Sequence, residues 1–186
     1  MKLAAALLMS CALTTVAAQP QAQLVMAGSE VSFTTRQMGV PVQGQFGSFS
    51  AQVRLDPKNP ASGSVSVIID TASARFGTAE LDREIGQPGW LASSRFPQAR
   101  FNSTAVRGLG GGRFEVLGQL ELKGTRRELL VRVSLAAAGA HSMASGNFVI
   151  NRLQFAIGEN EWADTSLLAA DVQVRFKLVL AGLPAP

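Results

Sequence analysis

The sequence predicts an all-β protein of about eight antiparallel strands, arranged as a barrel or a sandwich and interrupted by one short helical insertion. Apolar side chains recur at every second position along most of the 186 residues. That period is typical of strands with one buried face. Short glycine-containing links separate the runs, and such links join antiparallel neighbours. Only residues 78–96 depart clearly from this pattern.

The first part of the chain contains two predicted strands with a glycine-containing segment between them. The inward positions of these two runs are Val31, Phe33 and Thr35, then Val65, Val67 and Ile69. Gly44 and Gly47 lie within the strand-like segment between them. Glycine inside a strand marks a bend of the kind that a small barrel needs to close, or merely a tolerant surface position.

Four further runs follow the insertion. Their inward positions are Phe114, Val116, Leu120 and Leu122; Leu129, Val131, Val133 and Leu135; Phe148 and Ile150; and Val172, Val174, Phe176, Leu178 and Leu180. The alternation shifts by one residue after Ile150, so that Leu153 and Phe155 are expected to share a face.

The insertion has helical signals. Leu81 and Ile85 are spaced i,i+4, Thr78 suits the N-cap, and Gly86 suits the end of the helix. Pro88 suits the first turn of a second short helix. We therefore expect helical structure from about Thr78 to Phe96, between two strands.

The first 18 residues are typical of a secretory signal peptide. A basic start precedes the apolar run LAAALLMSCAL, and small residues follow, with cleavage expected after Ala18. Residues 19–186 then form a single domain, expected to be periplasmic or secreted. Cys11 is the one cysteine of the chain and lies in this segment. It is either a small residue of the signal peptide or the acylated residue of a lipoprotein.

The composition offers little for catalysis, metal binding or nucleic-acid binding. The chain has one histidine, His141, and no tyrosine. A single histidine does not supply a usual metal cluster, and no hydrolase or phosphate-loop motif is present. Asp82 and Glu84 point apart on a helix, because their spacing is i,i+2. The net charge of +4 is scattered rather than gathered in a basic stripe. We expect no cofactor, no metal site and no nucleic-acid partner.

Four motifs in order resemble the YceI-like family of secreted bacterial polyisoprenoid-binding or lipid-binding proteins. The segments are VSFTTRQMGV…GQFGSF (31–49), RFPQARFNSTAV (95–106), FEVLGQLELKGTRREL (114–129) and FVINRLQFAIG (148–158). The resemblance covers residues 30–180. It implies an eight-stranded antiparallel lipocalin-like barrel with a helical segment at one side. It also implies an isoprenoid or similar lipid chain held in the lumen, without catalysis.

The chain departs from the family pattern at several positions. Gln37 and Glu84 stand where the family often has histidine, and Leu81 stands where it often has arginine. The segment WLA, beginning at Trp90, replaces an aromatic-rich FFD. This variant is similar to the subgroup found near cytochrome b561-type membrane proteins. That similarity implies a quinone-like ligand and transient contact with a membrane or with such a protein.

These observations together predict a set of ligand-binding residues in the lumen. They are Phe33, Val67, Ile69, Trp90, Phe96, Phe101, Val131, Phe148 and Phe176. Trp90 and Phe96 are expected where the insertion meets the barrel, either in contact with the bound chain or only as a plug.

Two other functions stay open on the sequence alone. One is an enzyme acting on an apolar, isoprenoid-like substrate, and the other is a small outer-membrane barrel. Inward alternation looks the same whether side chains fill an eight-stranded barrel or leave room for one small ligand.

Overall fold

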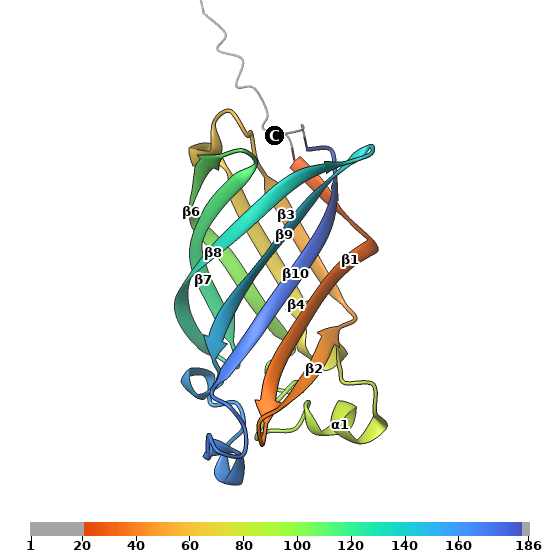
Figure 1. Ribbon diagram of the computed structural model, residues 1–186, viewed down its shortest axis with the longest axis vertical. Coiled ribbons are helices and arrows are strands. Elements are labelled where there is room, and N and C mark those ends of the chain that lie inside the picture. The colour runs from red at the N-terminus through yellow and green to blue at the C-terminus, as the bar shows by residue number, and fades with distance from the viewer. Residues whose placement is uncertain (1–20, 184–186) are drawn as a thin grey trace, which may run out of the picture.

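The computed structural model describes residues 21–183, and its strands close into a barrel (Figure 1). The strands are β1 (Gln21–Gln37), β2 (Val40–Phe46), β3 (Phe49–Arg54), β4 (Ser64–Asp70), β5 (Ala74–Arg75), β6 (Gln98–Gly110), β7 (Arg113–Leu122), β8 (Thr125–Ala138), β9 (His141–Asn151) and β10 (Asp171–Ala181). Their order is β10-β9-β8-β7-β6-β4-β3-β1-β2-β5, and β10 also pairs with β1. All the pairings are antiparallel.

These strands occupy eight positions around the barrel. β2 and β3 both pair with β1 and follow each other with only Gly47 and Ser48 between them, so together they form one bent strand. β5 is a two-residue addition beside β2. The predicted eight-stranded antiparallel barrel with a short helical insertion is confirmed.

The two glycines of the bent strand have different roles. Gly47 lies at the break between β2 and β3, where an added Cβ would meet nothing closer than the Ser73 carbonyl oxygen at 3.7 Å. Gly44 lies beneath the Phe33 ring, which a Cβ there would overlap. One glycine therefore marks the bend, and the other makes room for a lumen side chain.

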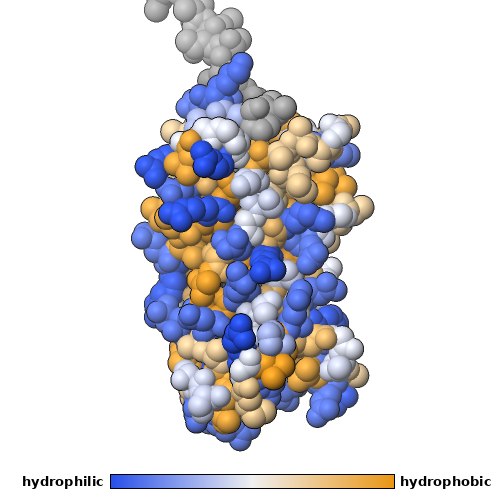
Figure 2. Space-filling model, viewed as in Figure 1, coloured by the Kyte–Doolittle hydropathy of each residue, from blue (hydrophilic) through white to orange (hydrophobic). Residues whose placement is uncertain are grey.

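The predicted alternation holds along the strands. On β10 the half-buried Phe176 points inward between Arg175 and Lys177, which are exposed. Two clusters of buried apolar residues follow each other along the barrel, and the second lies at the end that carries α1 (Ala79–Glu84). Figure 2 shows polar and charged residues spread over the visible outer wall, with smaller apolar areas between them.

The insertion begins as predicted and ends differently. Thr78 is the N-cap residue of α1, although its side chain makes no capping hydrogen bond. The predicted second helix at Pro88 is wrong, because residues 86–96 form successive turns. The Leu91 and Ser93 amides donate backward to the carbonyls of Ile85 and Gly86, and Ala92 has a left-handed φ of 49°. This backbone cannot continue as a helix.

The predicted pairing of Leu153 with Phe155 on one face is also wrong. β9 ends at Asn151, and Arg152–Phe155 form a 3₁₀ turn. In this turn Phe155 is buried and Leu153 is 41% exposed, because the chain no longer alternates. A second 3₁₀ turn, Asn160–Ala163, follows before β10.

Within residues 21–183, no helix has the length and apolar character needed to cross a membrane. The predicted signal peptide, with Cys11, lies outside the described residues.

Candidate functional site

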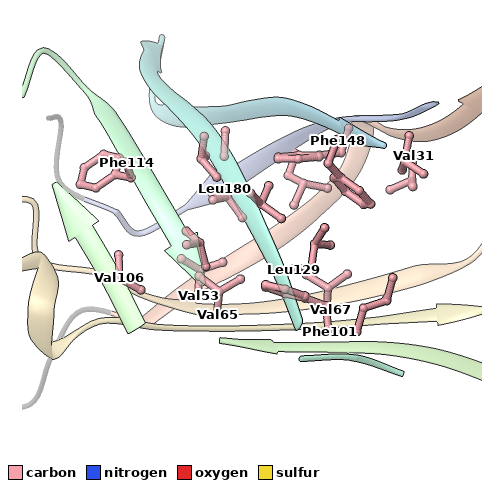
Figure 3. A pocket seen from close by; sticks show the side chains of 18 of the residues that line it. Val31, Val53, Val65, Val67, Phe101, Val106, Phe114, Leu129, Phe148 and Leu180 are labelled. Atoms are coloured by element: carbon pink, nitrogen blue, oxygen red, sulfur yellow. The ribbon is translucent and has the colours of Figure 1, made fainter. Parts of the chain in front are cut away.

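The barrel encloses an apolar cavity of about 140 Å³, which we call the upper cavity. Apart from Arg100, every residue of its lining is apolar. The lining comes from strands on all sides of the barrel, and Figure 3 shows side chains such as Val67, Phe101, Leu129 and Phe148 around the space. Hydrocarbon is the chemistry that such a surface accommodates, because it offers almost no hydrogen-bonding group.

A second cavity of about 240 Å³, the lower cavity, lies at the end of the barrel that carries α1. Its lining is also largely apolar, but it contains four polar residues: Thr35, Gln37, Glu84 and Arg152. Gln37 and Glu84 are the positions where the related family often has histidine. The lumen is therefore apolar along its length, and the few polar residues of its lining lie mainly at the lower end.

The two cavities adjoin. Five residues line both of them: Ile69, Ala99, Leu120, Phe148 and Val174. Ile69 and Ala99 are direct partners across the β4–β6 ladder. Ala99 projects only a methyl group toward the junction of the two cavities, and the larger side chain of Ile69 lies beside it. The two apolar cavities thus lie next to each other along the barrel.

The structure places most of the predicted site residues in the walls of these two cavities. Val67, Phe101, Val131 and Phe176 line the upper cavity; Phe33 and Trp90 line the lower cavity; Ile69 and Phe148 line both. Phe96 lines neither cavity. Its ring lies against Gly124, whose left-handed backbone (φ 75°) leaves space for it, with the Arg95 guanidinium 5.1 Å from the ring centroid. Phe96 therefore packs on the β7–β8 turn instead of on the lumen.

Trp90 joins the insertion to the segment that closes the lower end. Its indole N–H donates to Glu84 Oε1 at 2.9 Å, and its ring lies 5.7 Å from that of Trp162. The Gly89 carbonyl oxygen accepts hydrogen bonds from the amides of Gly158 and Glu159. Trp162 lines the lower cavity but carries no alternation signal; the sequence marks it only as one of two tryptophans.

Arg152 organises the closing segment, residues 152–170. Its side chain is almost completely buried, and it donates five hydrogen bonds of 2.5–3.0 Å to the carbonyl oxygens of Ile157, Gly158, Trp162, Leu168 and Ala169. Burial lowers the pKa of this guanidinium. Among the described residues no carboxylate forms an ion pair with Arg152. All five N–H groups are committed to the backbone, so Arg152 supports the site and leaves no donor for a ligand.

The two neighbouring carboxylates of α1, Asp82 and Glu84, do not act as a pair. Asp82 accepts from the Phe76 amide and Glu84 accepts from Trp90, so the two carboxylates have separate partners, as predicted. Residues 21–183 contain no group of three His, Cys, Asp or Glu side chains arranged to hold a metal ion. The arrangement suits enclosure of an apolar molecule with one polar end near Gln37 and Glu84.

Two solved structures share this fold. The structure superposes on BcnA of Burkholderia cenocepacia with a TM-score of 0.81 and 38% identity, over 84% of this chain and 98% of BcnA. A polyisoprenoid-binding domain from Saccharophagus degradans, implicated in plant cell wall breakdown, has the same fold, with a TM-score of 0.68 at 16% identity, over 91% of this chain and all of that domain.

Curated sequence relatives match over a shorter stretch. A UPF0312 protein of Vibrio campbellii is 31% identical over 114 residues, which are 61% of this chain and 60% of the relative. The match thus spans about three fifths of the length of that relative. The model of the YceI-like domain matches residues 23–180, which is most of the chain. The chain therefore belongs to the YceI-like family.

Proposed function

We propose that this protein binds and carries a lipid by enclosing its hydrocarbon chain, isoprenoid or similar, in the lumen, without catalysis. The observation that carries the proposal is the pair of adjoining apolar cavities along the barrel axis. An apolar cavity of about 150 Å³ in another protein stays dry and binds benzene. The lower cavity exceeds that size and the upper one nearly equals it, so the lumen is suited to hydrocarbon.

Burial of the chain supplies the binding free energy. Each CH₂ group removed from water contributes about 0.8 kcal/mol, and association costs roughly 4–15 kcal/mol. A chain of about 20 carbons, if fully enclosed, gains about 16 kcal/mol, which leaves about 1–12 kcal/mol after the cost of association. Micromolar binding needs about 8 kcal/mol, so it requires no specific polar contact when the association cost stays below about 8 kcal/mol.

The polar end of the lipid lies, in this proposal, in the lower cavity. The Gln37 side chain offers both donors and an acceptor there, and Glu84 already accepts the hydrogen bond of Trp90. A headgroup with a carbonyl oxygen, such as that of a quinone-like lipid, would accept from Gln37. The histidines common at these two positions in the family are then not needed for binding.

We also propose that the protein is exported to the periplasm or secreted, and that it exchanges its lipid with a membrane or with a cytochrome b561-type membrane protein. The predicted signal peptide supports export. Large apolar side chains at the lower end support a transient membrane contact, because Met38 is 68% exposed and Val40 is 62% exposed beside the β1–β2 turn.

The outer wall does not favour the outer-membrane barrel. A transmembrane barrel carries an apolar band on its outer face and commonly has a polar interior. Here the interior is apolar, and Glu128, Arg132, Arg175 and Lys177 are exposed on β8 and β10. Figure 2 likewise shows charged residues on the visible wall.

Obstructing the junction between the cavities tests the proposal. We expect Ala99→Phe to weaken binding of geranylgeraniol by at least about tenfold, because a ring at the junction keeps a long chain from occupying both cavities. Geraniol, half as long, fits in one cavity and should bind to Ala99→Phe and to the unaltered protein with similar affinity. Displacement of a fluorescent fatty acid measures both affinities.

The matched control is Ala105→Phe, which adds the same ring to an exposed position of β6. It should leave the binding of both alcohols unchanged. Equal weakening of both alcohols by Ala99→Phe, or no weakening of either, would contradict a continuous lumen.

A further inference from the structure

We infer that the hydrocarbon chain enters and leaves the lumen sideways, through an opening in the barrel wall between β8 and β9. This inference rests on the proposed lipid-binding function and adds the route that the ligand takes.

The opening is visible in the hydrogen-bond ladder. β8 and β9 pair from Ala138↔His141 to Arg132↔Asn147, and the pairing then stops. Residues 125–131 of β8 and 148–151 of β9 have no partner across this seam, although they remain paired with β7 and β10 on their other sides. The two strands thus separate toward the α1 end of the barrel (Figure 1).

A groove of about 910 Å³ lies along this seam. Five residues that line the groove also line the upper cavity: Phe114, Leu129, Val133, Phe148 and Phe176. Leu129, Phe148 and Phe176 are only half-buried, although they face the lumen. The groove and the lumen therefore share a wall of apolar side chains.

The groove lining mixes polar and apolar residues, and two exposed apolar residues lie on its outer rim. Leu130 is 47% exposed and Val149 is 53% exposed, and both line the groove on its outer side. In an unbroken ladder these two residues would face each other, given the register of the paired part. The apolar surface runs from the outside of the wall into the interior, with Arg132 and Arg175 beside it.

The two ends of the barrel are more tightly closed than this seam. At the upper end Leu55 and Leu135 are 7% and 5% exposed. At the lower end Phe155 is 1% exposed beneath the segment that Arg152 holds. A chain that entered at either end would have to displace packed side chains, whereas the seam has no backbone hydrogen bonds to break.

An ionic cluster fixes one border of the opening. Glu115 of β7 pairs with Arg107 of β6 and, at 3.4 Å, with Arg132 of β8. The hydrogen bond from Arg107 is the main cause that lowers the pKa of the Glu115 carboxyl. The cluster ties β8 to β7 at the residue where pairing with β9 begins. The ladders of β8 with β7 and of β9 with β10 continue along the opening, so each border of the seam is held by its own neighbour.

Bridging the seam tests this route. In a Cys11→Ser background, Leu130→Cys and Val149→Cys are joined by a reductant-cleavable bismaleimide, and stopped-flow fluorescence follows binding and release of cis-parinaric acid. We expect both rates to fall by at least about tenfold, with the equilibrium affinity unchanged. Cleavage of the linker should restore the rates, which shows that the bridged protein kept its fold.

The control pair is Gln119→Cys and Glu128→Cys, which face each other across the intact β7–β8 ladder. The same linker there should change neither rate. Unchanged rates with both pairs would overturn the lateral route while leaving lipid binding in place. Failure of the unbridged protein to bind cis-parinaric acid would instead overturn the carrier function, and the route with it.

Discussion

Replacing Ile69 by arginine is expected to lower the affinity for geranylgeraniol by at least about 100-fold, whereas the same change at Ile68 leaves it unaltered. Ile69 lines both cavities, and its neighbour Ile68 lines neither. A guanidinium at position 69 would occupy the lumen and face apolar side chains. An unpaired charge in such surroundings is strongly unfavourable, and binding of hydrocarbon beside it would remove the water that solvates it.

The two isoleucines form a matched pair, since they are adjacent on β4 and identical before substitution. Circular dichroism and thermal unfolding show whether each variant is folded. If Ile69→Arg does not fold, Ile69→Trp fills the same space without a charge and should also exclude the long alcohol. Normal binding by a folded Ile69→Arg, or equal losses at both positions, would place the ligand outside the lumen.

The second large effect is expected at Arg152. Arg152→Met should lower the free energy of unfolding by about 3–5 kcal/mol. The apolar part of the side chain is kept, but five backbone carbonyl oxygens lose their donors, most of them in buried positions. A buried acceptor without a partner costs about 1–3 kcal/mol, and the costs are not additive. Urea unfolding measures the change.

Arg127→Met is the control for this substitution. Arg127 is exposed and donates one hydrogen bond, to the neighbouring Arg126 carbonyl oxygen, so its loss should change stability by less than about 0.5 kcal/mol. Trp90 and Trp162, the two tryptophans of the chain, both lie at the lower end. Their fluorescence should therefore report loosening of this end in Arg152→Met. Equal stabilities of the two methionine variants would show that the network does not hold the closing segment.

The strands of the barrel could be predicted because their signal is local. An inward position needs an apolar side chain whichever strand lies beside it, so Val172 to Leu180 display the lumen face directly in the sequence. The Lys123-Gly124 turn is equally local. Both residues adopt left-handed backbone, with φ of 48° and 75°, as a two-residue hairpin of this twist requires.

The predictions that are wrong concern segments in which backbone hydrogen bonding is irregular. Pro88 is compatible with a first helical turn, but the chain beyond it bonds back to Ile85 and Gly86 instead. Phe96 was expected at the lumen because it precedes a strand, yet it packs on Gly124, nearly thirty residues away. In such segments the contacts are set by distant parts of the chain, which periodicity does not record.

The closing segment and the opening in the wall escaped prediction for the same reason. In the sequence Arg152 is marked only by the family-like motif FVINRLQFAIG, because its five acceptors are backbone carbonyl groups, which every sequence provides. The seam between β8 and β9 arises because residues of the two strands lack a backbone pairing partner there, which the sequence does not show. In the sequence, Leu130 and Val149 occupy ordinary outward positions of their strands. Eight of the nine predicted site residues nevertheless line the lumen, since that prediction needed only the alternation and the family resemblance.

The central claim is that the lumen holds the hydrocarbon chain of a lipid. Native mass spectrometry of the protein purified from its own host, without detergent, tests it most directly. We expect a population heavier than the polypeptide by the mass of one lipid, and the heavier species should be absent from Ile69→Arg purified in the same way. A single species with the mass of the polypeptide alone, together with no uptake of added geranylgeraniol, would contradict the claim.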